Sequence, residues 1–423
     1  MEERYKRPRG TQDVLPEESE RLEALRRHTR SVVSRYGYGE IQTPVFEQTA
    51  VFVDGVGDGT DIVQHERYTF TDAGGVSLTL RPEGTAAVAR AFVEHSMVNW
   101  PQPVRLYYWQ PMFRRERPQA GRFRQHTQYG IELIGSQHFS ADAEVIAVGV
   151  RILAELGKAP HVLVNSMGDE ECRPLYRAAL VEYYTAHRAE LCEDCQERLF
   201  INPLRLLDCK KDVALKEGAP DIGAYWCDAC RAHFDGLTGL LDAMGIVWSR
   251  DNGLVRGLDY YHRTVFEVHD PNLGAQSTLI GGGRYDGLAS RVGGAGVTPG
   301  VGFGAGAERL LLTLPPDFGV EDMPRVFIAQ VGEGSEGFLA AERLRRAGIA
   351  TDVDVLGRSL KAQMKDAARR ARFAVIAGGR EWAEGRAPVR DLESGETHDV
   401  ALDALVDDLR ARIAAARQGA VLS

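Results

Sequence analysis

The chain has 423 residues, with 51 Lys and Arg against 60 Asp and Glu, which gives a formal net charge of −9. The length predicts two or three domains, and the acidic balance argues against indiscriminate nucleic-acid binding while leaving room for local basic patches. No apolar stretch approaches a membrane span, the first residues do not have the pattern of a secretory signal, and six cysteines do not suggest a disulfide scaffold. We therefore expect a cytoplasmic protein.

The first predicted element is a helix. Apolar residues recur at helical spacing from Pro16 to Tyr36, with Pro16 at the start and Gly37 at the end. Residues 39–48 then have the composition of a strand that is broken by Pro44, which is typical of an edge or interface strand.

Three strand-like segments follow, at 76–84, 105–116 and 122–135, because they are rich in β-branched and aromatic residues. The second and third predict a hairpin whose turn is "RPQAG" (117–121). Residues 141–157 form an amphipathic pattern that ends at a glycine, so we expect a helix there.

The pattern changes twice in the rest of the chain. Between about 165 and 250 it is helical, and then strands return. This order predicts an α+β domain over 1–324, with an antiparallel sheet interrupted by a helical insertion. From residue 325 strands and helices alternate, which predicts a separate α/β domain over 325–423.

Five arginines lie within residues 114–124 of this acidic chain. Side chains alternate along a strand, so Arg114 and Glu116 are expected on one face, where a guanidinium can bind phosphate bidentately. A solvated charged loop is the alternative, and charge count alone favours it. Three residues on or near the turn can reach a larger anionic partner: Arg117, Gln119 and Arg122.

Glycines next to charged residues mark the segment "GVGFGAGAERLLL" (300–312), in which Arg309 follows a glycine-rich strand. The string also fits the dinucleotide pattern G-x-G-x-x-A. We reject that interpretation because no βαβ unit surrounds the glycines.

Two more segments combine glycine with arginine and tyrosine. In 254–268, Arg256, Tyr260 and Tyr261 surround Gly257 and are candidate pocket walls, although adjacent tyrosines are more often core residues. In "LIGGGRYDGL" (279–288), Tyr285 follows three glycines, for which a tight turn is the alternative.

Five cations in the C-terminal part have helical spacing of three or four residues and are expected on one helix face. Only Asp366 is an acidic neighbour in this stretch, so mutual repulsion favours a phosphate partner, and the alternative is a solvated face. The five cations, called the basic stripe below, are Arg358, Lys361, Lys365, Arg369 and Arg372.

Two Cys-x₂-Cys pairs, Cys192 with Cys195 and Cys227 with Cys230, raise the possibility of one four-thiolate zinc site. The gap between the pairs is longer than in the usual zinc ribbon, and both lie in helical sequence. We therefore do not favour zinc, assign no metal ligand, and treat Cys172 and Cys209 as buried thiols.

Together these motifs resemble a known family. A strand that ends in "FRRE", a turn, a return strand and a later glycine-rich strand leading into "ERL" look like motifs 2 and 3 of class II aminoacyl-tRNA synthetases. The first helix and Pro44 resemble motif 1, which builds the dimer interface of that class. "LRPEGT", "RGLDYYHRTVFE" and "GGGRYDGL" are similar to signatures of the histidyl-tRNA synthetase family, and the resemblance spans nearly the whole chain.

The resemblance implies a homodimer, not bound to a membrane, that activates L-histidine with ATP and Mg²⁺ and transfers it to the 3′ end of tRNA(His). It implies that the α-amino group of histidine is held by Glu83, Thr85 and Gln128. It further implies that Glu132 and Tyr261 bind the imidazole and that Tyr260 and Tyr285 line the pocket. A carboxylate and a phenol can indeed pair both ring nitrogens of an imidazole.

For ATP, the resemblance implies that Arg114 and Arg309 bind phosphates together with Glu116 and Arg122. The resemblance also implies that Arg256 lies at the α-phosphate and binds histidine, so Arg256 and Arg114 are the catalytic candidates. Positioned guanidiniums and Mg²⁺ are what charge developing on phosphate oxygens requires. For tRNA it implies acceptor-end contacts from Arg117 and Gln119, and a C-terminal anticodon-binding domain, to which the basic stripe belongs.

The alternative function is that of a related regulatory subunit of ATP phosphoribosyltransferase, which binds histidine without charging tRNA. That paralogue typically lacks the C-terminal domain and the arginine that matches Arg256. Because both are present here, we place this alternative second.

Overall fold

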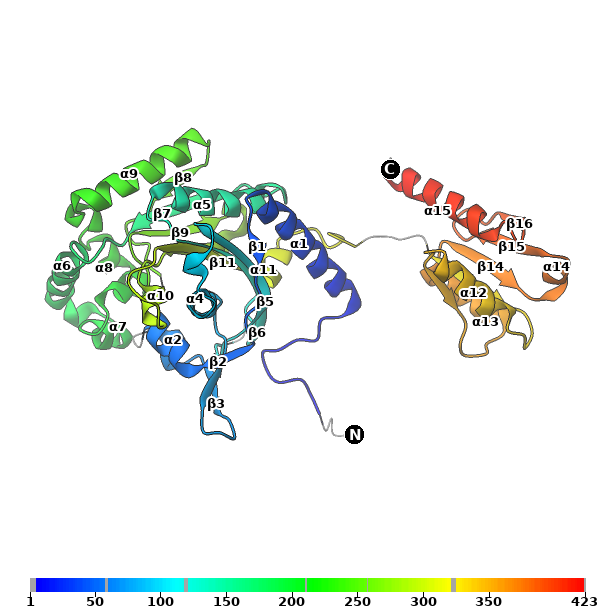
Figure 1. Ribbon diagram of the computed structural model, residues 1–423, viewed down its shortest axis with the longest axis horizontal. Coiled ribbons are helices and arrows are strands. Elements are labelled where there is room, and N and C mark those ends of the chain that lie inside the picture. Colours follow the sequence, from blue (N-terminus) through cyan, green and yellow to red (C-terminus); the bar gives the residue numbers. More distant parts are fainter. Residues whose placement is uncertain are drawn as a thin grey trace. The chain divides into compact units, whose positions relative to one another are not determined.

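The computed structural model describes residues 5–57, 60–117, 121–209, 211–256, 258–320 and 325–421. Two units follow each other along the chain, Met1–Val320 and Glu321–Ser423, and both are drawn in Figure 1. No helix of these described ranges is long and apolar enough to cross a bilayer.

An eight-stranded sheet is the centre of the first unit. Its inner neighbours pair antiparallel, as predicted, but the outermost pairs, β1 with β5 and β7 with β8, are parallel. Parallel neighbours need a long crossover connection, and the helical insertion supplies the one between β7 and β8. In spatial order the strands are β1 (Gly39–Glu40), β5 (Val104–Phe113), β6 (Gln125–Ile134), β11 (Gly300–Gly306), β10 (Thr278–Arg284), β9 (Thr264–His269), β7 (His161–Ser166) and β8 (Trp248–Arg250).

The predicted hairpin is formed by β5 and β6, but it is shorter than expected. The strand ends at Phe113, so Arg114 and Glu116 lie in the connecting loop and not on the strand. One more backbone bond, from Arg114 N–H to Arg124 O at 2.8 Å, still fixes the start of that loop.

Pro44 separates two strands that belong to different sheets. β1 lies before it at the edge of the large sheet, and β2 (Phe46–Gln48) after it. β2 joins β4 (Ser77–Leu80) and β3 (Tyr68–Thr71) in a small sheet of three strands. The interruption follows from proline itself, which has no N–H to donate to a ladder.

Helices cover both faces of the large sheet (Figure 1). On one face lies α5 (Phe139–Ala154), where a Cβ at Gly149 would lie 3.2 Å from Ile280 and 3.6 Å from Phe303, and α1 (Pro16–Arg35) packs against this helix. On the other face α4 (Thr85–Glu94) buries its apolar side against β5. Smaller helices in this unit are α2 (Thr49–Val56), α3 (Asp61–Gln64), η1 (Met97–Asn99), η5 (Pro271–Gln276), α10 (Leu288–Arg291) and α11 (Ala307–Leu311).

The helical insertion lies between β7 and β8. Its long helices frame it, and the segments between them are short. In chain order they are α6 (Arg173–Ala186), η2 (Arg188–Glu190), α7 (Glu193–Arg198), η3 (Pro203–Asp208), α8 (Val213–Glu217), η4 (Ile222–Tyr225) and α9 (Asp228–Ala243).

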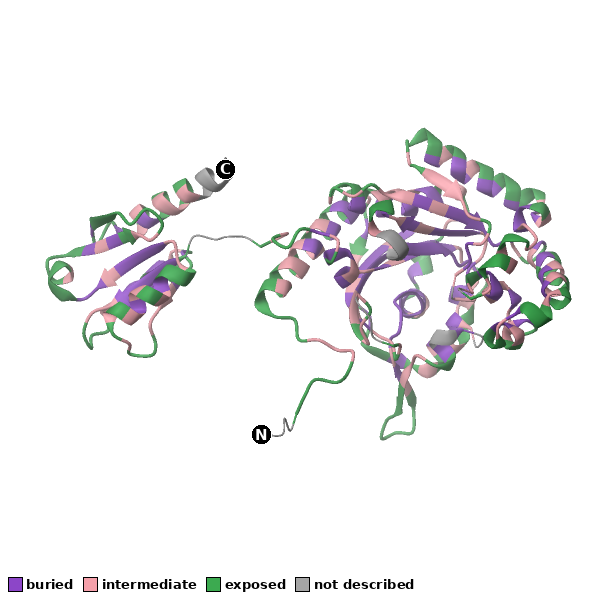
Figure 2. Cartoon of the chain, turned by 180° about the vertical axis from the view of Figure 1, so that it is seen from behind, coloured by how far each residue is buried: buried purple, intermediate pink, exposed green. Residues whose placement is uncertain are grey.

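The second unit is a five-stranded sheet with helices. The first three strands along the chain alternate with helices, as predicted, and pair in parallel. The last two strands form an antiparallel hairpin that was not predicted. Figure 2 shows buried strands and helices whose outer faces are exposed. The strands in spatial order are β13 (Thr351–Val353), β12 (Val326–Gln330), β14 (Phe373–Ala377), β15 (Arg386–Asp391) and β16 (Thr397–Ala401). The helices are α12 (Glu336–Arg346), α13 (Leu360–Arg370), α14 (Gly379–Ala383) and α15 (Leu405–Val421).

Candidate active site

Glycines on β10 and β11 form the floor of a polar cluster. Ile280 and Phe303 face α5, so alternate residues of these strands face the opposite side of the sheet. A methyl group at Gly302 would overlap the carboxylate of Glu132, and one at Gly281 would overlap a guanidinium. Glycine is therefore required at these positions, because the side chains of the cluster lie directly over the strand backbone and leave no room for a Cβ.

Glu132 is the central group of this cluster and is fully buried. The Thr85 hydroxyl donates to its Oε1 at 2.8 Å, and the Tyr285 hydroxyl donates to its Oε2 at 2.5 Å. Burial raises the pKa of Glu132 to about 8, although the two hydroxyl donors oppose that shift. The phenol that bonds this carboxyl is thus Tyr285, a residue expected only as a wall, and not Tyr261.

Aromatic rings close the pocket around that carboxyl. The ring of Tyr260 lies 4.8 Å from that of Tyr261 and 5.8 Å from that of Tyr285, and all three are buried. Gln128 donates to the hydroxyl of Tyr108 at 2.9 Å. No sequence motif marked Tyr108, which lies on β5 between the residues that stand opposite Glu132 and Gln128.

Glu83 lies at the N-terminus of α4. Its carboxylate accepts the backbone N–H groups of Thr85 at 2.7 Å and Ala86 at 2.8 Å. Burial raises the pKa of Glu83, and these two backbone bonds oppose the shift. The structure brings Glu83, Thr85, Gln128 and Glu132 to the same side of the sheet, with Thr85 as the link between α4 and the buried carboxyl.

Arg256 is held by an acid that the sequence analysis missed. Its Nη1 donates to Oε1 of Glu267 at 2.5 Å. Burial by itself raises the pKa of Glu267, but the hydrogen bond from His269 and the charge of Arg256 outweigh it and lower that pKa to about 2. The alternation of "TVFEVH" could have marked Glu267 as a polar residue within a strand. In the structure Glu267 stands opposite Gly281 of the neighbouring strand.

Further arginines lie near the hairpin loop. Arg114 Nε donates to the backbone oxygen of Pro82 at 2.8 Å, which fixes the direction of its guanidinium. Arg309 is half-buried at the start of α11, and burial and the charge of Arg122 both lower its pKa. Cations that face one another in this way favour an anionic ligand.

The hairpin loop and its flanks contain four of the predicted ligand contacts. Glu116 lies 3.6 Å from Arg122, so these two expected ATP contacts are neighbours. Arg117 is exposed at the hairpin loop. Gln119 lies outside the described residues.

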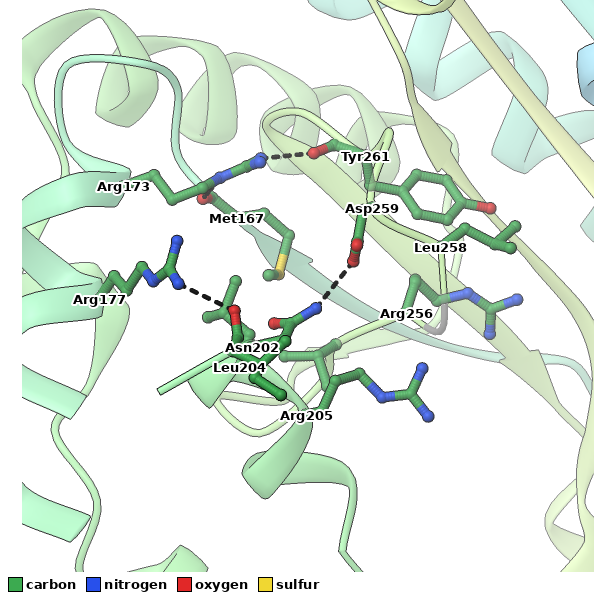
Figure 3. Close-up of a pocket in the computed structure, with 12 residues that line it drawn as sticks. Met167, Arg173, Arg177, Asn202, Leu204, Arg205, Arg256, Leu258, Asp259 and Tyr261 are labelled. Atoms are coloured by element: carbon green, nitrogen blue, oxygen red, sulfur yellow. Dashed lines mark hydrogen bonds between the residues drawn. The ribbon is translucent and has the colours of Figure 1, made fainter. Parts of the chain in front are cut away.

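A cavity of about 240 Å³ adjoins this cluster (Figure 3). It separates the insertion from the segment that carries Arg256 and Tyr261, and neither Glu132 nor Arg114 lines it. Across it, Asn202 donates to Asp259 at 2.9 Å, and Arg173 donates to the backbone oxygen of Tyr261. The insertion is therefore hydrogen-bonded to the segment that supplies two site residues.

The arginine of "GGGRYDGL" has a structural role. Arg284 is fully buried and forms ion pairs with Asp142 of α5 and with Asp286, the latter at 3.0 Å. This pairing anchors the backbone next to Tyr285.

The five cations of the basic stripe differ in whether they form ion pairs. Arg358 lies before α13 and pairs with Asp354 at 2.5 Å and Asp366 at 2.7 Å. Arg372 lies after the helix and pairs with Asp391 at 3.0 Å. The expectation of a single acidic neighbour is wrong, because Asp354, four residues before Arg358, and Asp391, nineteen residues after Arg372, pair with the two ends of the stripe. Three cations are left exposed on the helix: Lys361, Lys365 and Arg369.

The two Cys-x₂-Cys pairs lie in different clusters. Cys192 and Cys195 gather with Cys209 and Asp212, whereas Cys227 and Cys230 gather with Asp169 and Cys172. A single four-thiolate site is therefore wrong, and Cys172 and Cys209 are members of these clusters instead of isolated buried thiols.

Comparison with known proteins gives consistent matches along the chain. Residues 10–169 match the family model of histidyl-tRNA synthetase, and residues 326–412 match that of an anticodon binding domain. The chain is similar to the histidine–tRNA ligase of Desulforamulus reducens, with 50% identity over 96% of this chain and 99% of the relative. It is also similar to that of Geobacillus kaustophilus, with 49% identity over 96% and 98%.

A solved structure supports the same relationship. Apo histidyl-tRNA synthetase of S. aureus superposes with a TM-score of 0.79 at 37% identity, and covers 95% of this chain and 99% of its own. The predicted class II fold, an α+β catalytic part with a C-terminal anticodon-binding domain, is confirmed. The chain belongs to the histidyl-tRNA synthetase family.

Proposed function

We propose that this chain is a histidine–tRNA ligase, which joins L-histidine to the 3′ end of tRNA(His) at the expense of ATP. The observation that carries the proposal is the buried Glu132 carboxyl, which lies with two hydroxyl donors above a glycine floor and on the same side of the sheet as Arg256. Family membership and near-complete coverage of the relatives support it. The regulatory alternative is less supported, because residues 326–412 match an anticodon binding domain and Arg256 is present.

In the first step the histidine carboxylate attacks the α-phosphorus of ATP. A new P–O bond forms, the bond to pyrophosphate breaks, and charge grows on the phosphate oxygens. Arg256, Arg114 and Arg309 are the guanidiniums we assign to that charge. Glu116, the carboxylate next to Arg122, would hold a Mg²⁺ ion, which would neutralise part of the phosphate charge.

Recognition of the amino acid rests on Glu132. An imidazole has two ring nitrogens that need partners, and the carboxyl with the Tyr285 and Tyr261 phenols offers acceptors and donors for both. An amino acid without such a ring would leave these buried groups unpaired, and that penalty gives strong discrimination. We assign Glu83 and Gln128, on the same side of the sheet as Glu132, to the α-amino group.

In the second step the terminal 3′-hydroxyl of tRNA attacks the carbonyl carbon of histidyl-adenylate. The ester forms, AMP leaves, and the hydroxyl proton must be accepted. We assign no side-chain base among the described residues, and a phosphate oxygen of the adenylate takes the proton.

ATP–pyrophosphate exchange with each of the twenty amino acids tests the substrate. Exchange is expected with histidine alone, because only histidine satisfies the buried carboxyl and the phenols. Robust exchange with another amino acid would reject the substrate assignment, and absence of exchange with all twenty would favour the regulatory alternative.

The homodimer and the cytoplasmic location are parts of the proposal. Support for an interface near motif 1 is that Val45 and Phe46, directly after Pro44, are 41% and 49% exposed. Sedimentation of the full chain is expected to give twice the mass of one chain, and a monomer at micromolar concentration would contradict the dimer.

The basic stripe is proposed to bind tRNA through its exposed part. Replacing Lys361 and Arg369 by glutamate is expected to weaken tRNA binding and to reduce the slope of log K against log salt by about 2, since two phosphate contacts are lost. Histidine-dependent exchange needs no tRNA and stays unchanged. A matched control replaces Arg358, which is already paired with Asp354 and Asp366, and should change the slope less. An unchanged slope in the double variant would mean that the basic stripe does not bind tRNA and is a solvated helix face.

A further inference from the structure

Two clusters of four potential metal ligands lie in the insertion or at its start. The first, called cluster A, consists of Asp169, Cys172, Cys227 and Cys230. The second, called cluster B, consists of Cys192, Cys195, Cys209 and Asp212. In each cluster the four ligand atoms all lie within 4.8 Å of one another. Each cluster therefore has three sulfurs and one carboxylate around a common point.

The spacings fit a single tetrahedral ion. With Zn–S of about 2.3 Å, tetrahedral geometry places two sulfurs about 3.8 Å apart, and a sulfur and a carboxylate oxygen about 3.5 Å apart. Cys172 Sγ lies 3.7 Å from Cys230 Sγ, and Cys192 Sγ lies 3.8 Å from Cys209 Sγ. Cys227 Sγ lies 3.5 Å from an oxygen of Asp169.

Disulfides do not account for these clusters. A disulfide brings two sulfurs to about 2.05 Å, and all six cysteines are free thiols. Pairing two cysteines of a cluster would also leave the third one over, next to an aspartate. A four-ligand ion site uses every member, and a disulfide does not.

Neighbouring groups support the ligand atoms. In cluster A, Arg263 lies 3.3 Å from Asp169, and the backbone N–H of Asp169 donates to Cys172 Sγ at 3.2 Å. Gly168 leaves space for that sulfur, which a side chain there would overlap. In cluster B, the N–H of Cys192 donates to both oxygens of Asp212 at 3.2 Å, and the N–H of Lys211 donates to Cys209 Sγ at 3.4 Å. Such donors orient the ligands of metal sites.

We propose that clusters A and B each bind one zinc ion as a closed structural site of three thiolates and one carboxylate. Thiolates select soft or borderline metals, and a tetrahedral sulfur-rich set is typical of zinc. Four protein ligands complete the coordination shell, so neither ion has an open position for chemistry.

The sites lie where the insertion needs support. Cluster B joins the ends of α7, η3 and α8, which are five or six residues long and too short to be stable without tertiary contacts. Cluster A joins the start of α6 to the start of α9. Through the Asp169–Arg263 pair, cluster A is also connected to the segment of Tyr261 and Arg256. Zinc thereby fixes both the insertion and its contact with the active site.

Metal analysis of the full chain, purified without a metal-binding tag and dialysed, tests the proposal. The expected content is two zinc per chain, with one left in Cys172→Ser, one left in Cys209→Ser, and none in the double variant. These two cysteines are the informative ones, because a single site built from the two Cys-x₂-Cys pairs gives one zinc and loses none in either variant.

A milder pair of variants covers the case in which the cysteine changes prevent folding. Asp169→Asn is expected to lower the zinc affinity of one site at least tenfold in competition with a chelating dye. Glu170→Gln removes an exposed carboxylate next to it and should leave both sites intact. Equal affinities in the two variants would reject Asp169 as a ligand.

The unmodified chain gives an independent readout. A thiol-modifying reagent should release two zinc ions to the dye as six thiols react, and chelation should expose residues 187–225 to protease. A wild-type chain without bound zinc, or with all six thiols reacting at the rate of free thiols, would overturn the proposal.

Discussion

Replacing Arg256 by alanine is expected to slow histidyl-adenylate formation by about 10²–10³-fold, the usual cost of removing one preorganised donor from a developing charge. Arg256 is suited to this role because Glu267 fixes its guanidinium at 2.5 Å over the glycine floor. Histidine affinity without ATP should fall far less. Single-turnover formation of the adenylate, together with calorimetric binding of histidine, measures the two effects separately.

Matched variants distinguish catalysis from a structural ion pair. Arg256→Lys should restore the rate only in part, since it returns the charge without the bidentate fork. Arg177→Ala removes an exposed arginine from the same cavity and should leave the rate unchanged. Gly281→Ala leaves Arg256 in the chain but displaces its guanidinium, and should slow the reaction as well. A wild-type rate in Arg256→Ala with a lowered melting temperature would make Arg256 structural.

Replacing Glu132 by glutamine is expected to weaken histidine binding by about 10–10²-fold, because an imidazole nitrogen left without its buried hydrogen-bond partner costs roughly 1–3 kcal/mol. ATP affinity should change little, since the arginines assigned to ATP do not contact this carboxyl. Calorimetry with each ligand measures both. Glu144→Gln is the control, because Glu144 pairs with Arg105 away from the cluster. Equal losses of histidine and ATP affinity would assign Glu132 to the structure of the pocket.

The same variant should stabilise the ligand-free protein at neutral pH. Burial raises the pKa of Glu132 from 4.5 to about 8. Between these values the unfolded carboxyl ionises while the folded one keeps its proton, so the free energy of unfolding falls as pH rises through this window. Glutamine cannot ionise and does not share this loss. The melting temperature of the variant minus that of wild type should therefore grow from pH 4.5 to pH 8, and a constant difference would contradict the raised pKa.

Local patterns in the sequence were sufficient for most elements. The helical period before Gly37, the position of Pro44 and the antiparallel pairing of the two strands that flank 117–121 are confirmed, because proline, glycine and side-chain periodicity act within a few residues. Motifs in the sequence likewise named Arg256 and Tyr285 as candidate site residues, and the family resemblance named Glu132. The structure brings the Tyr285 hydroxyl onto the Glu132 carboxyl.

The tertiary structure decided which residues stand opposite one another on neighbouring strands of the sheet. Gly281 stands opposite Glu267, and Gly302 stands opposite Glu132, only because β10 pairs with β9 and β11 with β6. That pairing assigned Glu267 to Arg256, and the folded pocket placed the Tyr285 phenol on Glu132.

The chain alone thus determined the class of fold, the candidate site residues and the charge on α13. The structure decided how cysteines divide between two clusters, which cations of the basic stripe meet carboxylates, and which acid holds Arg256. The physical reason is the range of the interactions: turns, caps and periodicity depend on neighbours in sequence. Ion pairs, metal-ligand sets and the register of strands depend instead on where segments meet in space, so residues 4 positions apart and residues 58 positions apart become partners alike, and local periodicity does not predict which.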